Sequence, residues 1–496
     1  MILAFVTEGG VFYIQITVWR FRMKLYNSWS RSIEDFIPYE GKTVKMYTCG
    51  PTVYNYAHIG NLRTYIHEDI LEKTLNYLEY DVKRVMNITD VGHLESDADD
   101  GEDKMLKGAQ RENKTVWQVA EFYTQAFFKD CDKLNIKKPE VVAKAIDYID
   151  QYIDFIKTLE AKGFTYVANG NVYFDISKFP KYTGLSRMNL EELKIAHRDD
   201  VEEDLHKKNP QDFVLWFTKS KFENQAMKWD SPWGTGYPGW HIECSVISLS
   251  NLGEQLDIHC GGVDHIPVHH TNEIAQTESY TGKAWTKYWW HAEFLNEGSG
   301  KMSKSSGEFL TVSLLEKKSF DPLSYRYYVL NSHYRKQLNF SFESLDMAQS
   351  AYHKLRRKTS ALLEKSDVVK VEASNLSQAA REILVKFEDC LADDLNTANA
   401  ITVVYDLLKL DIDASEKVSV LTQMDQVLSL DLLKPLSEVS QELEGDEAQW
   451  IQEQLQKRTE AKASKNWKLA DEIRDELKAK DIVIIDTAEG AQWKKV

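Results

Sequence analysis

Apolar and polar positions follow one another along the chain in the order expected of a parallel sheet. Residues 42–49 and 81–88 are apolar-rich runs of strand length, and the first ends at Gly50-Pro51. Between them, apolar residues recur at helical spacing from Leu62 to Leu78. A strand, a helix and a strand in this order predict parallel pairing through a right-handed crossover. Open sheets of this kind bind nucleotides at the carboxyl ends of their strands, where Cys49 and residues 87–90 fall.

The rest of the chain divides by the same signals into helical, mixed and strand-like stretches. Helical spacing dominates twice, at 115–161 and again at 344–433, where glycine is scarce. Strands are expected at 171–175, and the sheet resumes near 239–244 and 256–259. A polar, mixed stretch at 183–225 indicates an inserted subdomain, and 434–449 has the composition of a linker. The last residues, 450–496, predict one long charged helix and then a strand at 482–485.

Composition narrows the class of protein. The chain has 496 residues, of which 43% are hydrophobic and 28% charged, so a largely disordered protein is excluded. The formal net charge of −16 argues against a protein that coats nucleic acid nonspecifically, although a local basic surface stays compatible with it. The five cysteines are odd in number and widely spaced, which favours a reducing cytoplasm over a secreted disulfide scaffold.

The first 22 residues do not have the order of a signal peptide. Their apolar start, 1–6, precedes the basic residues, whereas a signal peptide has the opposite order. A strand within 11–20 is one interpretation, and a native start at Met23 is the favoured one. No run of eighteen apolar residues occurs, so no membrane span is expected.

A metal site is suggested by side chains far apart in the sequence. His269 and Glu273 are four residues apart, so on a helix both can reach one ion. Cys49 and Cys244 would add two thiolates from strand ends, and two sulfurs, a nitrogen and a carboxylate suit zinc. Spacing alone is weak evidence, because buried cysteines are common. The alternatives are Cys260 as a ligand, and further histidines as ligands or substrate contacts: His241, His259, His265 and His270.

Two segments have the chemistry of nucleotide phosphate sites. In His58-Ile59-Gly60-Asn61, Gly60 permits a tight turn into a helix, whose first N–H groups, with His58 and Asn61, could face a phosphate. The segment 301–307 follows a flexible Gly-Ser-Gly and carries two ammonium groups, Lys301 and Lys304, among hydroxyls. Each segment alone is ordinary, but their order on one sheet indicates ATP.

These motifs resemble the HIGH and KMSKS signatures of the class I aminoacyl-tRNA synthetases, and more narrowly the cysteinyl-tRNA synthetase family. The resemblance runs from about Met23 to the C-terminus. Further segments carry it, at 47–54, 87–90, 239–245, 257–264, 269–276, 393–397 and 470–475. Asn61 departs from the family, because the last position of HIGH is otherwise histidine, and Thr271 stands where an acid is common.

The resemblance implies an α/β fold: a Rossmann-like catalytic domain with an inserted connective subdomain, a C-terminal helical domain and a small terminal α+β unit. The expected boundaries are 1–22 for an N-terminal extension, 23–138 and 228–300 for the two catalytic halves, 139–227 for the insertion, 301–345 for the KMSKS loop and stem-contact region, 346–434 for the helical tRNA-binding domain, 435–449 for the linker and 450–496 for the anticodon-binding unit.

The resemblance also assigns roles. Zinc falls to Cys49, Cys244, His269 and Glu273, which demotes Cys260. His58, Gly60, Asn61 and Lys304 would bind ATP with Mg²⁺, and His58, Asn61, Lys301 and Lys304 would act in catalysis. Thr89, Trp240 and Asp264 would line the cysteine pocket, and Trp467, Asp471 and Asp486 would read the anticodon of tRNA(Cys).

The expected reaction is ATP-dependent ligation of L-cysteine to tRNA(Cys) through a cysteinyl-adenylate, in a cytoplasmic monomer. Two rivals stay open. One is a ligase that joins activated cysteine to a small amine, as in mycothiol synthesis. The other is a zinc protein that binds RNA and has lost catalysis, for example through Asn61.

Overall fold

The catalytic core is built on a parallel sheet whose strands come from two separated parts of the chain. The computed structural model describes residues 2–7, 10–15, 23–91, 104–189, 205–219, 227–297, 300–301, 309–363, 371–434, 446–464, 466–478, 482–487 and 490–495. Within these residues the sheet has the order β13-β12-β5-β6-β7. Its strands are β5 (Thr43–Thr48), β6 (Asp81–Ile88), β7 (Val141–Lys144), β12 (Leu256–Gly262) and β13 (Thr286–Ala292).

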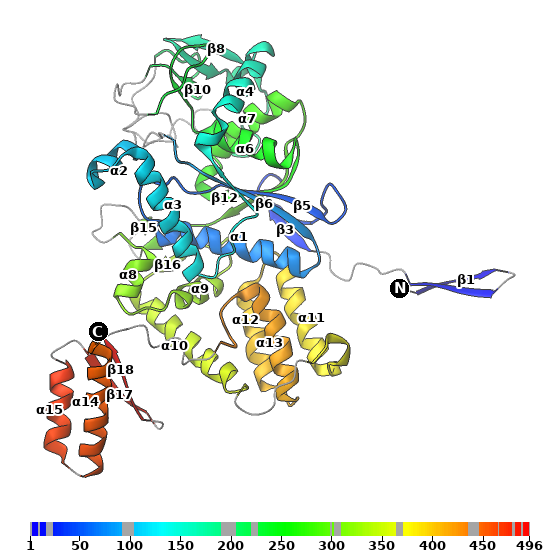
Figure 1. Ribbon diagram of the computed structural model, residues 1–496. Coiled ribbons are helices and arrows are strands. Elements are labelled where there is room, and N and C mark those ends of the chain that lie inside the picture. The colour runs from blue at the N-terminus through cyan, green and yellow to red at the C-terminus, as the bar shows by residue number, and fades with distance from the viewer. Residues whose placement is uncertain are drawn as a thin grey trace.

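The predicted strand, helix and strand at the start of the core are confirmed. Helix α1 (Ile59–Tyr77) joins β5 to β6, which pair in parallel from Thr43 opposite Asp81 to Thr48 opposite Met86. The two halves of the sheet meet at β5 and β12, which also pair in parallel. The sheet is covered on one side by α1 and on the other by α6 (His241–Leu252) and α7 (His269–Thr281) (Figure 1).

One expectation about this core was wrong. Residues 241–252 form helix α6 where the sheet was expected to resume, because a short apolar run bounded by glycine does not separate a strand from a buried helix. The expectation that helices dominate 115–161 is confirmed. Between α3 (Val116–Lys133) and α4 (Ile149–Ala161) lies β7, a short edge strand that pairs with β6 from Val141 to Lys144.

The insertion after α4 carries its own antiparallel sheet in the order β11-β10-β9-β8. Its strands are β8 (Thr165–Ala168), β9 (Asn171–Phe174), β10 (Phe213–Phe217) and β11 (Tyr237–Pro238). The strand expected at 171–175 is therefore confirmed. This sheet lies beyond α4, α6 and α7, away from α1 (Figure 1).

The helical region follows a second small sheet, of order β15-β14-β16. That sheet consists of β14 (Leu295–Glu297), β15 (Gly300–Lys301) and β16 (Leu338–Phe340). The helices are α8 (Val312–Lys317), α9 (Pro322–Leu330), α10 (Phe342–Ser360), α11 (Gln378–Ala392), α12 (Thr397–Lys409) and α13 (Ala414–Leu428), as the spacing predicted from 344 onward. One continuous apolar core runs from the parallel sheet into these helices, so the helical region is packed against the catalytic core.

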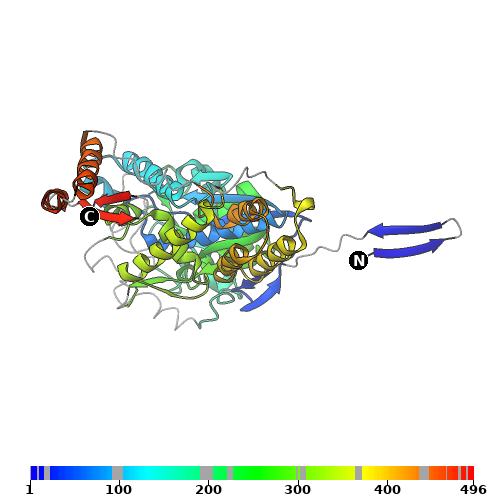
Figure 2. The same cartoon turned by 90° about the horizontal axis from the view of Figure 1, so that it is seen from below.

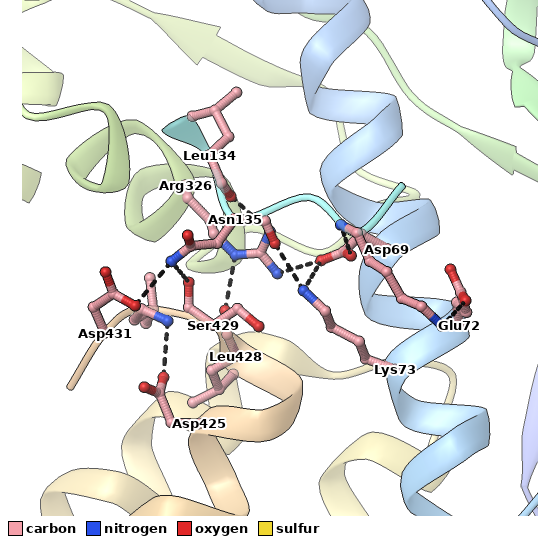
Figure 3. Close-up of polar contacts among 12 residues, drawn as sticks. Asp69, Glu72, Lys73, Leu134, Asn135, Arg326, Asp425, Leu428, Ser429 and Asp431 are labelled. Carbon is pink, nitrogen blue, oxygen red and sulfur yellow. Dashed lines mark hydrogen bonds and ion pairs between the residues drawn. The ribbon is translucent and has the colours of Figure 1, made fainter. Parts of the chain in front are cut away.

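A buried polar joint fixes the helical region against α1 (Figure 3). The guanidinium of Arg326 on α9 donates to Asp69 of α1 at 2.7 Å and to the carbonyl oxygen of Leu428 on α13 at 2.8 Å. Lys73 also donates to Asp69, at 2.7 Å. Asn135 donates from its side chain to the carbonyl oxygen of Ser429 at 3.1 Å. Four segments distant in sequence are thereby joined at one place.

The terminal unit has a core of its own, and the expectation of one long helix there was wrong. Residues 446–478 form α14 (Asp446–Ala463) and α15 (Trp467–Lys478). The predicted strand is confirmed as β17 (Ile482–Thr487), which pairs with β18 (Gly490–Lys495). Part of the expected linker, 446–449, already belongs to α14.

At the other end, β1 (Ile2–Thr7) and β2 (Gly10–Gln15) form a hairpin, which stands clear of the sheet in both views (Figures 1 and 2). The remaining short strands, β3 (Lys24–Asn27) and β4 (Ser32–Asp35), pair with each other. Among the described residues, no helix is both long and apolar enough to cross a membrane.

Candidate active site and metal centre

Four buried side chains from β5, α6 and α7 converge at the base of a cavity. Cys49 follows β5 directly, Cys244 lies in the first turns of α6, and His269 and Glu273 are on α7. Cys244 therefore reaches the cluster from a helix, although a strand end was expected. The Sγ atoms of Cys49 and Cys244 are 3.8 Å apart, and Cys244 Sγ is 3.5 Å from His269 Nε2.

These separations match the edges of a tetrahedral zinc site. Bonds of about 2.3 Å to sulfur and about 2.0 Å to nitrogen place two sulfurs about 3.8 Å apart, and sulfur and nitrogen about 3.5 Å apart. His269 Nε2 lies 2.8 Å from Glu273 Oε1, yet neither carboxylate oxygen of Glu273 makes a hydrogen bond. A buried carboxylate without a hydrogen bond is costly, and a bound cation would remove that cost. The residues present therefore fit a zinc ion.

A second group of possible ligand residues shares Cys49 and Glu273 with the first. Cys49 Sγ is 3.6 Å from His259 Nε2 and 3.4 Å from His270 Nε2, and His259 Nε2 is 3.3 Å from Glu273 Oε2. Cys49, His259, His270 and Glu273 form a second group whose ligand atoms lie within 4.8 Å of one another and could hold a metal ion. Of the histidines that the sequence left open, these two are possible ligands. Cys260 belongs to neither group, because side chains alternate along β12 and that of His259 faces the cluster.

Other histidines stand behind the possible ligands. His241 Nδ1 is 2.9 Å from His269 Nδ1, on the side of that ring away from Glu273. His270 Nδ1 is 2.8 Å from His291 Nε2, and His291 Nδ1 is 2.8 Å from Ser28 Oγ. Such contacts fix ring orientation and tautomer in metal sites. His291 and Ser28 were missed by the sequence analysis, because nothing in their local sequence marks them.

Burial favours the neutral form of Cys49, Glu273, His259 and His270. It raises the pKa of the Cys49 thiol, with a further rise from the hydrogen bond to Cys244. It also raises the pKa of the Glu273 carboxyl, and it lowers the pKa of His259 and His270. A divalent cation would reverse this for the thiols and the carboxyl, because it stabilises their ionised forms.

The cavity above the cluster has a volume of about 410 Å³. It is lined by the possible metal ligand Cys49, by the HIGH-like residues His58, Gly60 and Asn61, and by Trp240, Asp264, Glu293, Phe294 and Phe309, among others. Glu293 and Phe294 follow the end of β13, so the rule that selected Cys49 would also have found them. Thr89 is not among the lining residues. Its hydroxyl donates to Glu243 Oε2 at 2.7 Å.

The HIGH-like segment forms the first turn of α1. His58 is the N-cap residue, and its Nδ1 accepts a hydrogen bond from the N–H of Gly60 at 3.0 Å. Gly60 lies inside the helix, so the expectation that it makes the turn was wrong. The glycine that the bend requires is Gly50, where a Cβ atom would lie 1.7 Å from the carbonyl oxygen of Asn87. The first turn of α1 lines the cavity, and its N–H groups are bonded within the protein: Ile59 donates to the carbonyl oxygen of Leu310 and Asn61 to that of His58, each at 2.9 Å.

Several predicted site residues lie outside the cavity or outside the described residues. Lys304 and the acidic run 95–103 lie outside the described residues, whereas the backbone of Lys301 belongs to β15. In the terminal unit, Trp467 at the start of α15 is exposed, and Asp471 pairs with Arg474 at 3.0 Å. Asp486 lies in β17.

Comparison with known proteins defines the class and then the family. Residues 35–350 match the family of class I (C) tRNA synthetase catalytic domains, and residues 386–430 match the DALR domain. Two solved synthetases share the fold. A methionyl-tRNA synthetase of Mycobacterium tuberculosis has a TM-score of 0.51 and 15% identity, covering 78% of this chain and 90% of its own. A LeuRS of Agrobacterium radiobacter K84 has a TM-score of 0.55 and 11% identity, covering 80% of this chain and 84% of its own. The protein is a class I aminoacyl-tRNA synthetase.

Curated relatives narrow the class to one specificity. The cysteine–tRNA ligase of Treponema denticola is 49% identical over 96% of this chain and 100% of its own length. That of Borrelia hermsii is 44% identical over 95% and 99%. The chain belongs to the cysteine–tRNA ligase family.

Proposed function

We propose that the protein attaches L-cysteine to tRNA(Cys) in two steps and recognises the substrate thiol through zinc. In the first step a carboxylate oxygen of cysteine attacks the α-phosphorus of ATP, and the bond to pyrophosphate breaks. In the second step the 3′-terminal ribose hydroxyl of the tRNA attacks the carbonyl carbon of the adenylate, and AMP leaves. The observation that carries the proposal is that Cys49 belongs both to the metal cluster and to the wall of the cavity.

Zinc at Cys49, Cys244, His269 and Glu273 would supply a soft Lewis acid that bonds a thiolate far more strongly than a serine hydroxyl. This chemistry answers the hardest problem of specificity, because an apolar pocket discriminates poorly between near-isosteric side chains. Trp240 and Asp264 line the same cavity. In this proposal Trp240 packs on the amino acid, and Asp264 accepts from its ammonium group. Thr89 is buried, and its hydroxyl donates to Glu243. In this proposal Thr89 positions Glu243.

The nucleotide would lie at the start of α1. His58 and Asn61, in the first turn of this helix, bind its phosphates, and Lys301 and Lys304 bind the pyrophosphate leaving group together with Mg²⁺. We propose that the helical region 346–434 and the terminal unit 450–496 contact the tRNA. In this unit Trp467 would stack on an unpaired anticodon base, while Asp471 and Asp486 accept from base amino groups.

The decisive experiment is ATP–pyrophosphate exchange with and without cysteine, followed by charging of tRNA(Cys). Exchange that depends on cysteine and ignores serine is expected. Its absence would contradict the proposed activity and favour an RNA-binding protein without catalysis. Exchange without tRNA charging, but with ligation to a small amine, would favour the mycothiol-type ligase. The helical region argues against that ligase, because a small acceptor does not require it.

The KMSKS-like segment, which carries Lys301 and Lys304, provides a second test. Replacing Lys304 with alanine removes a cation from the developing charge on the phosphates, so the exchange rate should fall about a hundredfold or more. A matched control is Lys317→Ala in α8, whose lysine lies outside this segment. An exchange rate unchanged in Lys304→Ala would contradict the role of the segment.

A further inference from the structure

The segment 393–397, between α11 and α12, has no part in the proposed reaction, yet its backbone conformation and its side-chain contacts are unusually constrained. Asp394 and Leu395 have φ values of 54° and 59°, in the left-handed region that few residues adopt. The Asp394 side chain is 3% exposed. A buried carboxylate on a loop of such restricted conformation has a defined position and demands partners.

The partners of Asp394 come from two distant segments. Oδ1 accepts from the hydroxyl of Tyr334 at 2.6 Å and from the N–H of Tyr26 at 2.9 Å. Oδ2 accepts from Nε of Arg335 at 2.7 Å, and Nη2 of Arg335 is 2.6 Å away. The N–H of Asp394 itself donates to the carbonyl oxygen of Lys24 at 3.1 Å. The carboxylate therefore ties the helical region to residues 331–337, which we call the α9–β16 loop.

The α9–β16 loop is bound in turn to the edge of the cavity. Arg63, two residues after Asn61 in α1, is fully buried and donates to the carbonyl oxygens of Phe294 at 2.8 Å and of Lys336 at 2.5 Å. It also contacts the carbonyl oxygen of Glu293. Because Glu293 and Phe294 line the cavity, one guanidinium joins the nucleotide helix, the cavity edge and the loop that Asp394 holds.

Backbone hydrogen bonds extend this link to Lys301, at the start of the KMSKS-like segment. The N–H of Glu293 donates to the carbonyl oxygen of Tyr334 at 2.8 Å. Beyond the loop, β16 pairs in parallel with β14, and β14 pairs with β15, where Asn296 lies opposite Lys301. Asp394 is thus connected to the strand of Lys301 through one loop and two strand pairings.

We infer that Asp394 is a positioning residue for the nucleotide site: it holds the α9–β16 loop so that the cavity edge and the strand of Lys301 are aligned for ATP. The inference rests on the proposed adenylation step. Cysteine binding does not depend on this contact, because the possible metal ligands lie on β5, α6 and α7. The inference gives the helical region a direct physical connection to the chemical step.

The test is Asp394→Asn. Asparagine tolerates the left-handed conformation and keeps one oxygen for Tyr26 and Tyr334, but it loses the charge that holds Arg335. In cysteine-dependent exchange, the KM for ATP should rise about tenfold, while the KM for cysteine stays unchanged. Rates are divided by the concentration of active sites, which is measured by single-turnover adenylate formation, so that misfolded enzyme does not affect them. An unchanged KM for ATP, or equal rises in both KM values, would overturn the inference.

A matched control separates positioning from general loosening. Asp425 is another carboxylate of the helical region, and it accepts from the N–H groups of Leu430 at 2.8 Å and Leu432 at 2.9 Å. Asp425→Asn should lower the thermal midpoint and leave the KM for ATP unchanged. A similar rise in the KM for ATP in both variants would contradict a specific role of Asp394.

If Asp394→Asn does not fold, Tyr334→Phe tests the same link. It removes only the hydroxyl at 2.6 Å from Asp394 and keeps the ring stacked on Trp290. The KM for ATP should rise about threefold, and no rise would overturn the inference. Wild-type enzyme without any cysteine-dependent exchange would instead refute the proposed function, so the two failures are distinguishable.

Discussion

Two buried polar regions of this protein are built on opposite principles. In the joint around Arg326, cations and the carboxylate of Asp69 bind one another and nearby carbonyl oxygens (Figure 3). In the cluster around Glu273, thiols, imidazoles and a carboxylate crowd together, and the carboxylate makes no hydrogen bond. The joint is electrostatically complete, whereas the cluster lacks positive charge. The first region stabilises the fold through its own charges, whereas the second is a cluster that could hold a metal ion.

The largest expected effect concerns the cluster. Cys244→Ser replaces a soft ligand with a hard one, so the zinc content should fall well below one per chain. Cysteine charging should fall on the order of a thousandfold. Elemental analysis and charging assays measure the two effects. Cys131→Ser is the control, because Cys131 is buried in α3 and belongs to neither ligand group. Full zinc content in Cys244→Ser would mean that the cluster is not the metal site.

The next effect concerns the joint. Asp69 is fully buried, and although burial alone would raise its pKa, Arg326 and Lys73 hold the pKa of this carboxyl below its usual range. Asp69→Asn leaves these cations without their carboxylate, so the free energy of unfolding should fall by about 3 kcal/mol. Urea unfolding measures it. Glu40→Gln, which breaks the more exposed pair with Lys45, should cost less than about 1 kcal/mol. Equal losses would remove the distinction between the two pairs.

A smaller effect tests the residues behind the ligands. His241 Nδ1 lies 2.9 Å from His269 Nδ1 and orients that ring. His241→Gln should weaken zinc binding about 10- to 100-fold without abolishing it. Competition with a chelator of known affinity measures this change. Unaltered affinity would show that His269 is oriented by other contacts.

The smallest effect is the pH dependence of the joint. Burial, and then the charge of Arg326, lower the pKa of Lys73 from 10.5 to about 8. Between these values the unfolded chain binds more protons than the folded one, so Lys73 makes the free energy of unfolding rise with pH. The rise should be about 1–2 kcal/mol, less than the full shift implies, because the side chain is 16% exposed. Lys73→Met should lack this increment when unfolding is measured from pH 7.5 to 10.5. Parallel curves of unfolding free energy against pH for the wild type and Lys73→Met would contradict this prediction.

The parts of this structure that the sequence predicts are those governed by local periodicity. Strands β5 and β6, helix α1 and the i, i+4 pair His269 and Glu273 follow from spacing within one element. Helix α6 was misjudged and strand β7 was not predicted, because their assignment depends on packing partners far along the chain. For the same reason no local pattern indicated that His291 contacts His270, and the motif at 393–397 did not indicate that Asp394 binds Tyr334.

The ligand set also crosses the seam between the two halves of the parallel sheet. Cys49 comes from the half before the insertion, and Cys244, His269 and Glu273 come from the half after it. An ion held by all four acts as a cross-link between polypeptide segments that the chain itself connects only through the distant insertion. Its affinity therefore contains part of the free energy of assembling the catalytic domain, and starving the protein of metal would compromise folding as well as substrate choice.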